Sequence, residues 1–176
     1  MKKRKLFFTS SILSLFLFLF SFGNVVYAYS IIYGSKNMPN QYDIQLYPVW
    51  NNIDYSTNLS IGKNAWNSSA ARVYFNTYST PTRAPYVKVT DFYFGNTQWH
   101  AMAYCYTAAN VSPNIQINDS YYPFGGNGAE LIAHELGHIL RLDDISDSTS
   151  LMLSAGYKGN PTPAQDDVNG VNSVYP

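Results

Sequence analysis

The alternation of hydrophobic and polar residues predicts a strand followed by a helix in the first half of the chain. Apolar and polar side chains alternate over residues 42–47, which is typical of a strand with one buried face, and Pro48 is expected to end it. Hydrophobic residues then recur at helical spacing over residues 58–70. Asn58 or Ser60 is the predicted N-cap of this helix, and Trp66 is expected in the core.

Several strands are predicted after this helix. β-Branched and aromatic residues are most concentrated over residues 86–94, and shorter runs of the same character occupy residues 71–75, 99–106 and 115–117. Turn-forming residues separate these runs. A strand, a helix and several strands ahead of further helices indicate an α+β fold with a mixed β-sheet.

A second helix is predicted from its capping pattern. Asn127 is followed three residues later by Glu130, which predicts a helix that starts at Gly128. Leucine and isoleucine residues recur on one side of this helix, so that side is expected to pack on the sheet while the opposite side faces a cleft.

The last helix is predicted from a similar signal. Thr162 is its expected cap, Pro163 its first residue, and Gln165 completes a capping box. Asp166 and Asp167 follow, where negative charge stabilises the amino-terminal end of a helix. We favour this structural role for the two aspartates over a functional one.

The first residues predict the compartment. Residues 2–5 are basic, residues 6–22 are almost entirely apolar, and small residues lie near Ala28 where signal peptidase would cleave. We therefore expect residues 1–28 to be a signal peptide and the protein to be secreted or held in the cell envelope. An uncleaved membrane anchor is the alternative. Residues 29–176 are then long enough for one domain.

Charge and cysteine content narrow the function classes. Without the four basic residues of the leader, eleven acidic residues face seven basic ones, so nucleic acid and anionic membranes are not expected partners. We expect a monomer without stable membrane association after cleavage. Cys105 is the single cysteine, which excludes an intramolecular disulfide, and we interpret it as a small core residue of a strand.

The pentapeptide His134–Glu135–Leu136–Gly137–His138 carries the clearest chemical signal. Side chains four residues apart lie on the same face of a helix, so His134 and His138 can bind one metal ion together. Glu135 lies beside them, where it can act as a base on a metal-bound water.

A catalytic zinc needs a third protein ligand. No glutamate follows Glu135, so a glutamate from a later helix is excluded. An aspartate oxygen or His100 from a strand is left as the candidate. Because His100 is the only histidine outside the motif, a second zinc is not expected, and the scattered Asp and Asn residues do not indicate calcium.

Residues 134–144, HELGHILRLDD, resemble the metzincin signature HExxHxxGxxH/D and are most similar to the matrixin branch of these zinc proteases. The resemblance extends through residues 150–152 and 157–171 to the carboxyl terminus. It implies a metzincin-like catalytic domain, with a twisted mixed sheet, an active-site helix, a Met-turn and a carboxy-terminal helix.

The resemblance also implies residue roles. Asp144 would be the third zinc ligand, as aspartate is in snapalysin-like members. The adjacent Asp143 is the alternative third ligand. Met152 would form the Met-turn beneath the metal, and Tyr157 is a candidate for the substrate pocket. The extended substrate would lie along an edge strand, for which residues 99–106 are our candidate.

Two residues depart from the matrixins proper, Arg141 and the aspartate at Asp144 in place of the usual histidine, and one family feature is absent. Arg141 replaces the glycine that allows a sharp reversal after the second histidine, and a left-handed arginine costs about 1 kcal/mol. The cysteine switch that keeps matrixins latent has no counterpart, because Cys105 lies in the middle of the domain.

The leading hypothesis is a secreted zinc-dependent endopeptidase that acts on protein or peptide substrates with Glu135 as general base. The alternative is a secreted binding or adhesion module with a structural or catalytically inactive zinc. A purely structural zinc has no use for a base and normally takes a fourth protein ligand, so Glu135 favours the enzyme.

Overall fold

The computed structural model describes residues 29–32, 38–106 and 111–176. Its centre is a five-stranded sheet in the order β3-β2-β4-β6-β5, formed by β3 (Phe75–Thr77), β2 (Ile44–Val49), β4 (Val87–Phe92), β6 (Asn114–Asn118) and β5 (Ala101–Tyr104). Strands β3, β2, β4 and β6 run parallel to one another, and β5 is antiparallel to β6. The α+β class and the mixed sheet are thus confirmed, and β5 lies at an edge of the sheet as expected for residues 99–106.

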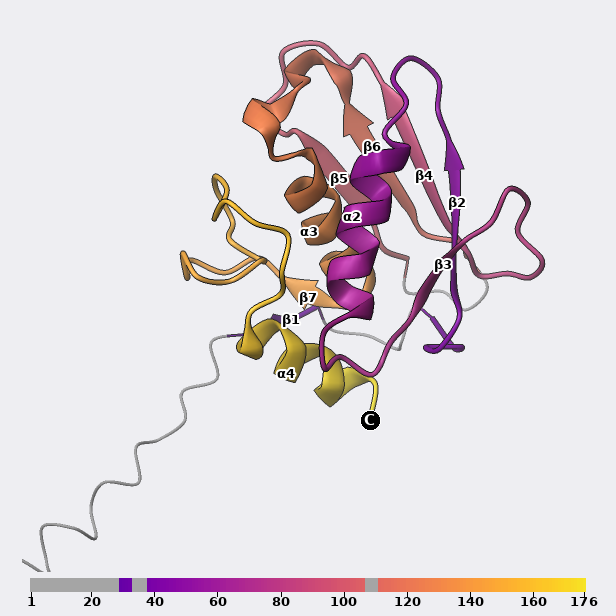
Figure 1. The fold of residues 1–176 in the computed structure, drawn as a ribbon, viewed down its shortest axis with the longest axis vertical. Helices are drawn as coiled ribbons and strands as arrows, with labels where there is room; N and C mark the ends of the chain where they lie inside the picture. The colour runs from indigo at the N-terminus through magenta and orange to yellow at the C-terminus, as the bar shows by residue number, and fades with distance from the viewer. Residues whose placement is uncertain (1–28, 33–37, 107–110) are drawn as a thin grey trace, which may run out of the picture.

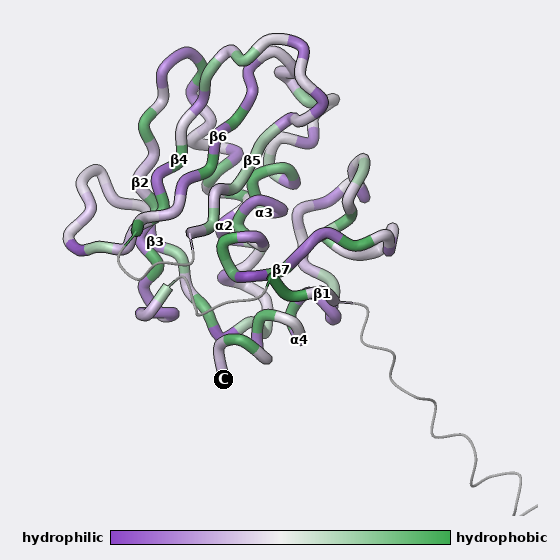
Figure 2. Tube along the Cα trace, turned by 180° about the vertical axis from the view of Figure 1, so that it is seen from behind, coloured by the Kyte–Doolittle hydropathy of each residue, from purple (hydrophilic) through white to green (hydrophobic). Residues whose placement is uncertain are grey.

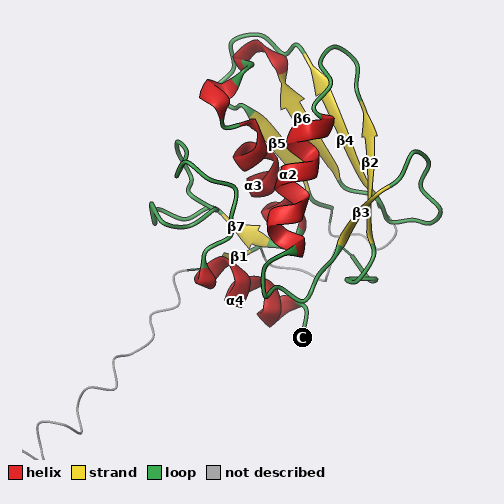
Figure 3. Cartoon of the chain, in the orientation of Figure 1, coloured by secondary structure: helices red, strands yellow, loops and turns green. Residues whose placement is uncertain are grey.

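Helices α2 (Ser56–Asn67) and α3 (Gly128–Ile139) lie side by side on one face of the sheet, as the red and yellow elements of Figure 3 show. The short helix α4 (Gln165–Val174) lies near the small ladder formed by β1 (Ser30–Ile31) and β7 (Leu142–Asp143) (Figure 1). Two short 3₁₀ helices, Asp119–Tyr121 and Phe124–Gly126, connect β6 to α3.

The core forms because one set of alternating side chains in the central strands meets the apolar faces of the helices. Figure 2 shows this alternation along the strands and the hydrophobic character of α3. The two helices approach closely at Gly62, where an added Cβ would lie 2.9 Å from the carbonyl oxygen of Ala129. Trp66 is fully buried, and its Nε1 donates a hydrogen bond of 2.8 Å to the carbonyl oxygen of Ala133.

Several predicted boundaries were wrong. The first strand continues through Pro48, because β3 ends opposite Leu46 and leaves Pro48 with a neighbouring strand on one side only. Helix α2 begins at Ser56 and ends at Asn67, so neither Asn58 nor Ser60 caps it; Asp54 accepts a hydrogen bond from the Ser56 N–H instead. The strand predicted over residues 71–75 is displaced to Phe75–Thr77.

The amino-terminal ends of the last two helices also differ in detail. Helix α3 starts at Gly128 as predicted, but the Asn127 side chain makes no capping hydrogen bond. Helix α4 starts at Gln165 rather than at Pro163, with Ala164 as its N-cap residue. The Asp167 carboxylate accepts the Ala164 N–H, which is the helix-start role expected for this aspartate.

The predicted signal peptide, residues 1–28, lies outside the described residues. Among the helices of the described ranges, none has both the length and the apolar character needed to cross a bilayer.

Candidate metal centre

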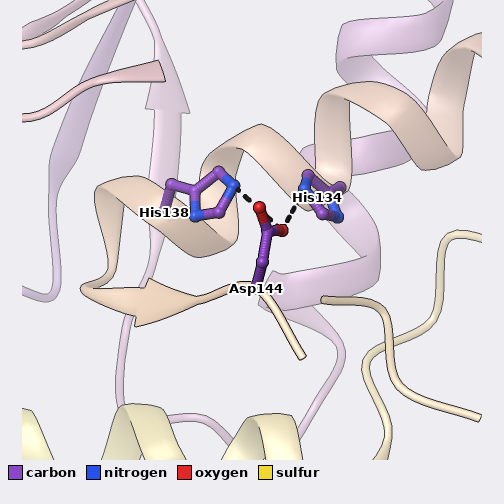
Figure 4. Close-up of side chains that lie close together, drawn as sticks. All are labelled: His134, His138 and Asp144. Carbon is purple, nitrogen blue, oxygen red and sulfur yellow. Dashed lines mark ion pairs between the residues drawn. The ribbon is translucent and has the colours of Figure 1, made fainter. Parts of the chain in front are cut away.

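Three side chains converge on the exposed side of helix α3 (Figure 4). His134 and His138 lie one turn apart with their ring centres separated by 4.7 Å. Oδ1 of Asp144 lies 3.3 Å from Nε2 of His134 and 3.6 Å from Nε2 of His138. One potential ligand atom from each residue falls within 4.8 Å of the others. The geometry therefore brings together the three residues that the sequence motif suggested.

The turn that delivers Asp144 passes through Arg141. Helix α3 ends at Ile139, and Arg141 adopts a left-handed conformation with φ of 79° while its N–H donates to the carbonyl oxygen of His138. An arginine in this conformation costs about 1–2 kcal/mol compared with an ordinary helical residue. The arginine side chain is only 1% exposed, which the sequence did not suggest. The position thus has the conformation that usually favours glycine after a helix.

Backbone carbonyl groups select the tautomer of both neutral imidazoles. Nδ1 of His134 lies 2.9 Å from the carbonyl oxygen of Leu151, and Nδ1 of His138 lies 2.9 Å from that of Leu142. A carbonyl oxygen only accepts hydrogen bonds, so each Nδ1 carries the proton and each Nε2 keeps a free lone pair when the ring is neutral. Such outer contacts orient histidine ligands in metal sites. The donor set, two Nε2 atoms and one carboxylate, fits a catalytic zinc with an open position.

Asp144 and His134 shift one another's pKa. The hydrogen bond with His134 holds the pKa of Asp144 below its usual range, while partial burial acts in the opposite direction. Burial by itself would lower the pKa of His134, but the carboxylates of Asp144 and Glu135 and the Leu151 carbonyl raise it overall. Asp143 lies outside the cluster, and its Oδ1 accepts a hydrogen bond from the Asp144 N–H.

Glu135 is buried beside the two histidines. Its side chain is 4% exposed, and burial raises the pKa of its carboxyl group. A backbone hydrogen bond from Ala103 of β5 supports the charged form, as does the proximity of His138 and His134. Oε2 has no hydrogen-bond partner among the described residues. A buried carboxylate oxygen without a partner is costly, and a functional site is one place where this cost is tolerated.

Met152 packs beneath the helix that carries the histidines. Its side chain is 1% exposed, and an added Cβ at Gly137 would overlap the Met152 sulfur. The glycine between the histidines therefore allows the turn at residues 150–152 to approach the helix closely. Met152, for which the resemblance implies a Met-turn, therefore lies directly against helix α3.

Two buried carboxylates hold the segments around the centre, and the sequence analysis missed this role for both. Glu130 does not complete a helix cap; it accepts hydrogen bonds from the backbone N–H groups of Lys158 and Gly159, at 2.6 and 2.9 Å. Asp167 accepts the Ser150 hydroxyl at 2.5 Å and the Leu151 N–H at 2.9 Å in addition to its capping contact. Glu130 is a charged residue between Ala129 and Leu131, which is a weak signal of a buried anchor, whereas Asp167 follows Gln165 and Asp166 and offers no such signal.

A cleft of about 720 Å³ opens beside the cluster, lined by residues 98–103 and 153–157 together with the motif residues. The Tyr157 hydroxyl lies 2.7 Å from Nδ1 of His100, and the two rings are stacked. Burial, with Glu130 and Glu135 nearby, raises the pKa of Tyr157 to about 12. His100 therefore belongs to the cleft wall, outside the cluster of potential ligands.

Cys105 differs from its predicted environment. It follows β5 instead of lying within it, is half-buried, and borders the same cleft. Its Sγ donates a weak hydrogen bond of 3.3 Å to the carbonyl oxygen of His138. The cysteine therefore contacts the backbone of helix α3 as well as the core.

The sequence matches no protein-family model, and a search of curated proteins found no match.

Proposed function

We propose that the protein is a secreted zinc-dependent endopeptidase of the metzincin type, with His134, His138 and Asp144 as metal ligands. The observation that carries the proposal is the convergence of these three groups next to the buried Glu135 at the wall of an open cleft. Three protein ligands leave a coordination position for water or substrate, whereas a structural zinc is normally closed by a fourth protein ligand.

The histidines and Glu135 have different roles in this proposal. The two imidazoles offer their Nε2 atoms because the backbone carbonyls of Leu151 and Leu142 hold the Nδ1 protons. A zinc ion bound there would polarise the scissile carbonyl group and lower the pKa of a coordinated water. As general base, Glu135 would accept a proton from a water molecule and deliver it to the leaving amine.

The environment of Glu135 suits a proton carrier. Burial raises the pKa of its carboxyl group from the ordinary value, and the closer this pKa lies to the working pH, the more readily the group both takes and gives a proton. The Ala103 N–H, which hydrogen-bonds to the same carboxylate, fixes its position against β5. We further propose that the peptide substrate lies extended along this edge strand, with Tyr157 in the pocket wall.

The decisive experiment mixes residues 29–176 with an unbiased peptide pool, with and without a zinc chelator, and measures bound zinc on the same sample. We expect about one zinc per chain and cleavage that the chelator abolishes. Glu135→Gln should keep the zinc and lose cleavage, because the amide cannot accept the proton. Cleavage by Glu135→Gln at the rate of the unaltered protein would contradict the proposal. Bound zinc with no cleavage of any peptide would favour the binding or adhesion module.

A further inference from the structure

The segment that carries Asp144 is paired with residues from the other end of the chain. Ser30 lies opposite Asp143 and Ile31 opposite Leu142 in the antiparallel β1-β7 ladder. The N–H of Ile32 donates a hydrogen bond of 2.8 Å to the carbonyl oxygen of Arg141. We propose that residues 29–32 are a positioning element of the metal centre, which holds the turn between the second histidine and Asp144. This inference rests on the proposed zinc site.

The turn needs support from outside helix α3. Arg141 is left-handed and therefore strained, and Asp144 follows only three residues later. Among the described residues, β7 pairs with β1 and with no other strand. Two hydrogen bonds within residues 138–142 fix one side of the turn. The Arg141 N–H donates to the carbonyl oxygen of His138, and Nδ1 of His138 donates to the carbonyl oxygen of Leu142. Without β1, the opposite edge of the two-residue strand would lose its backbone partner.

Helix α4 packs against β7 and Tyr29 at Gly170. A Cβ added at Gly170 would lie 2.6 Å from Cδ2 of Leu142 and 3.0 Å from Cγ of Tyr29. The glycine therefore permits both β1 and β7 to lie directly against α4. Leu142, 1% exposed, is enclosed between them. The position of Asp144 thus depends on a three-part contact among residues 29–32, β7 and α4.

The position of this element links it to maturation. If export cleaves the chain after Ala28, as the sequence predicts, Tyr29 becomes the first residue of the mature protein. Ile32 also borders the cleft beside the metal ligands. The amino-terminal residues of the mature chain would then set the metal affinity of the centre.

Replacing Ile32 tests the backbone contact. Ile32→Pro removes the N–H that donates a hydrogen bond to the carbonyl oxygen of Arg141. Ile32→Ala keeps this N–H and serves as the matched control. Zinc affinity is measured by competition with a chromogenic chelator, and the thermal midpoint of each variant is measured in excess chelator. We expect Ile32→Pro to bind zinc about tenfold more weakly than Ile32→Ala, as for other outer contacts of a metal site, with similar midpoints for the two metal-free variants.

Two outcomes overturn the inference: equal zinc affinity of the two Ile32 variants, or a loss of metal-free stability in Ile32→Pro large enough to account for the weaker binding. If Ile32→Pro fails to fold, Gly170→Ala, compared with Asn169→Ala, decides instead, because the new methyl group pushes on Tyr29 and Leu142. A zinc affinity of Gly170→Ala equal to that of Asn169→Ala overturns the inference. Absence of zinc from the unaltered chain would contradict the proposed function and this inference together, whereas equal affinities among zinc-binding variants contradict this inference alone.

Discussion

The Asp167 carboxylate accepts a hydrogen bond of 2.5 Å from the Ser150 hydroxyl, which ties the first turn of α4 to the turn beneath helix α3. The same carboxylate accepts the N–H of Leu151, and the carbonyl of Leu151 receives the Nδ1 proton of His134. One buried aspartate near the end of the chain therefore supports a metal-ligand candidate through a single intervening residue.

Replacing this aspartate should damage the fold. We expect Asp167→Asn to lower the free energy of unfolding by about 2–4 kcal/mol, because three donors lose a charged acceptor and the new amide brings its own unmatched N–H groups. Asp166→Asn, one residue earlier and partly exposed, should change it by less than about 0.5 kcal/mol. Urea unfolding in chelator measures both, and equal effects would contradict the anchoring role.

Replacement of Asp144 should weaken zinc binding far more than replacement of the adjacent Asp143. We expect Asp144→Asn to weaken zinc binding by at least about 100-fold, since loss of a ligand should exceed the effect of losing an outer contact. Asp143→Asn should stay within about threefold, because this exposed side chain lies outside the ligand cluster and accepts its hydrogen bond from the Asp144 N–H. Chelator competition gives both affinities. A larger loss with Asp143→Asn would reassign the third ligand.

The contact between Gly137 and Met152 predicts coupling. Gly137→Ala should destabilise the protein by about 1–3 kcal/mol through overpacking, even though alanine is the better helix former by about 1 kcal/mol. Met152→Ala opens space for the new methyl group, so the double variant should lose at least about 1 kcal/mol less than the sum of the single losses. Urea unfolding of all four proteins completes the cycle, and strict additivity would show that the two side chains do not meet.

Zinc should reverse the pH dependence of stability. Without metal, the raised pKa of His134 stabilises the fold fully below its ordinary value of 6.5 and ceases to do so as pH rises through the raised value. The lowered pKa of Asp144 stabilises the fold above its ordinary value of 3.8, and this contribution is lost as pH falls through the lowered value. The Asp144–His134 pair therefore stabilises the metal-free protein most between pH 3.8 and 6.5.

Zinc binding requires neutral imidazoles, so zinc affinity should rise with pH. It should rise over the range in which the metal-free protein loses the stabilisation that the raised pKa of His134 provides. Thermal midpoints at pH 5.5 and 8, in chelator and in zinc, test the reversal, with Asp144→Asn as the control that removes the pair. An identical pH profile for the chelated unaltered protein and for Asp144→Asn would count against the pairing of Asp144 with His134.

The local sequence determined the elements and the core of the chemical motif. Side-chain periodicity and capping signals act within a few residues, so β2, β4, β5 and β6, the start of α3 at Gly128 and the four-residue spacing of His134 and His138 could be predicted without tertiary contacts, whereas β1 and β7 could not. Element ends were less accurate: β2 continues through Pro48 because, among the described residues, β4 is the only strand paired with it there, which its own residues do not record.

Only the tertiary structure decided which distant groups meet. Whether Asp143 or Asp144 faces the histidines depends on the left-handed turn at Arg141, and that turn is paired with residues more than a hundred positions earlier. Glu130 and Asp167 read as helix-start residues, yet each accepts backbone N–H groups from segments that the sequence places well away. A buried charge must find partners wherever the fold supplies them, and no local pattern records that choice.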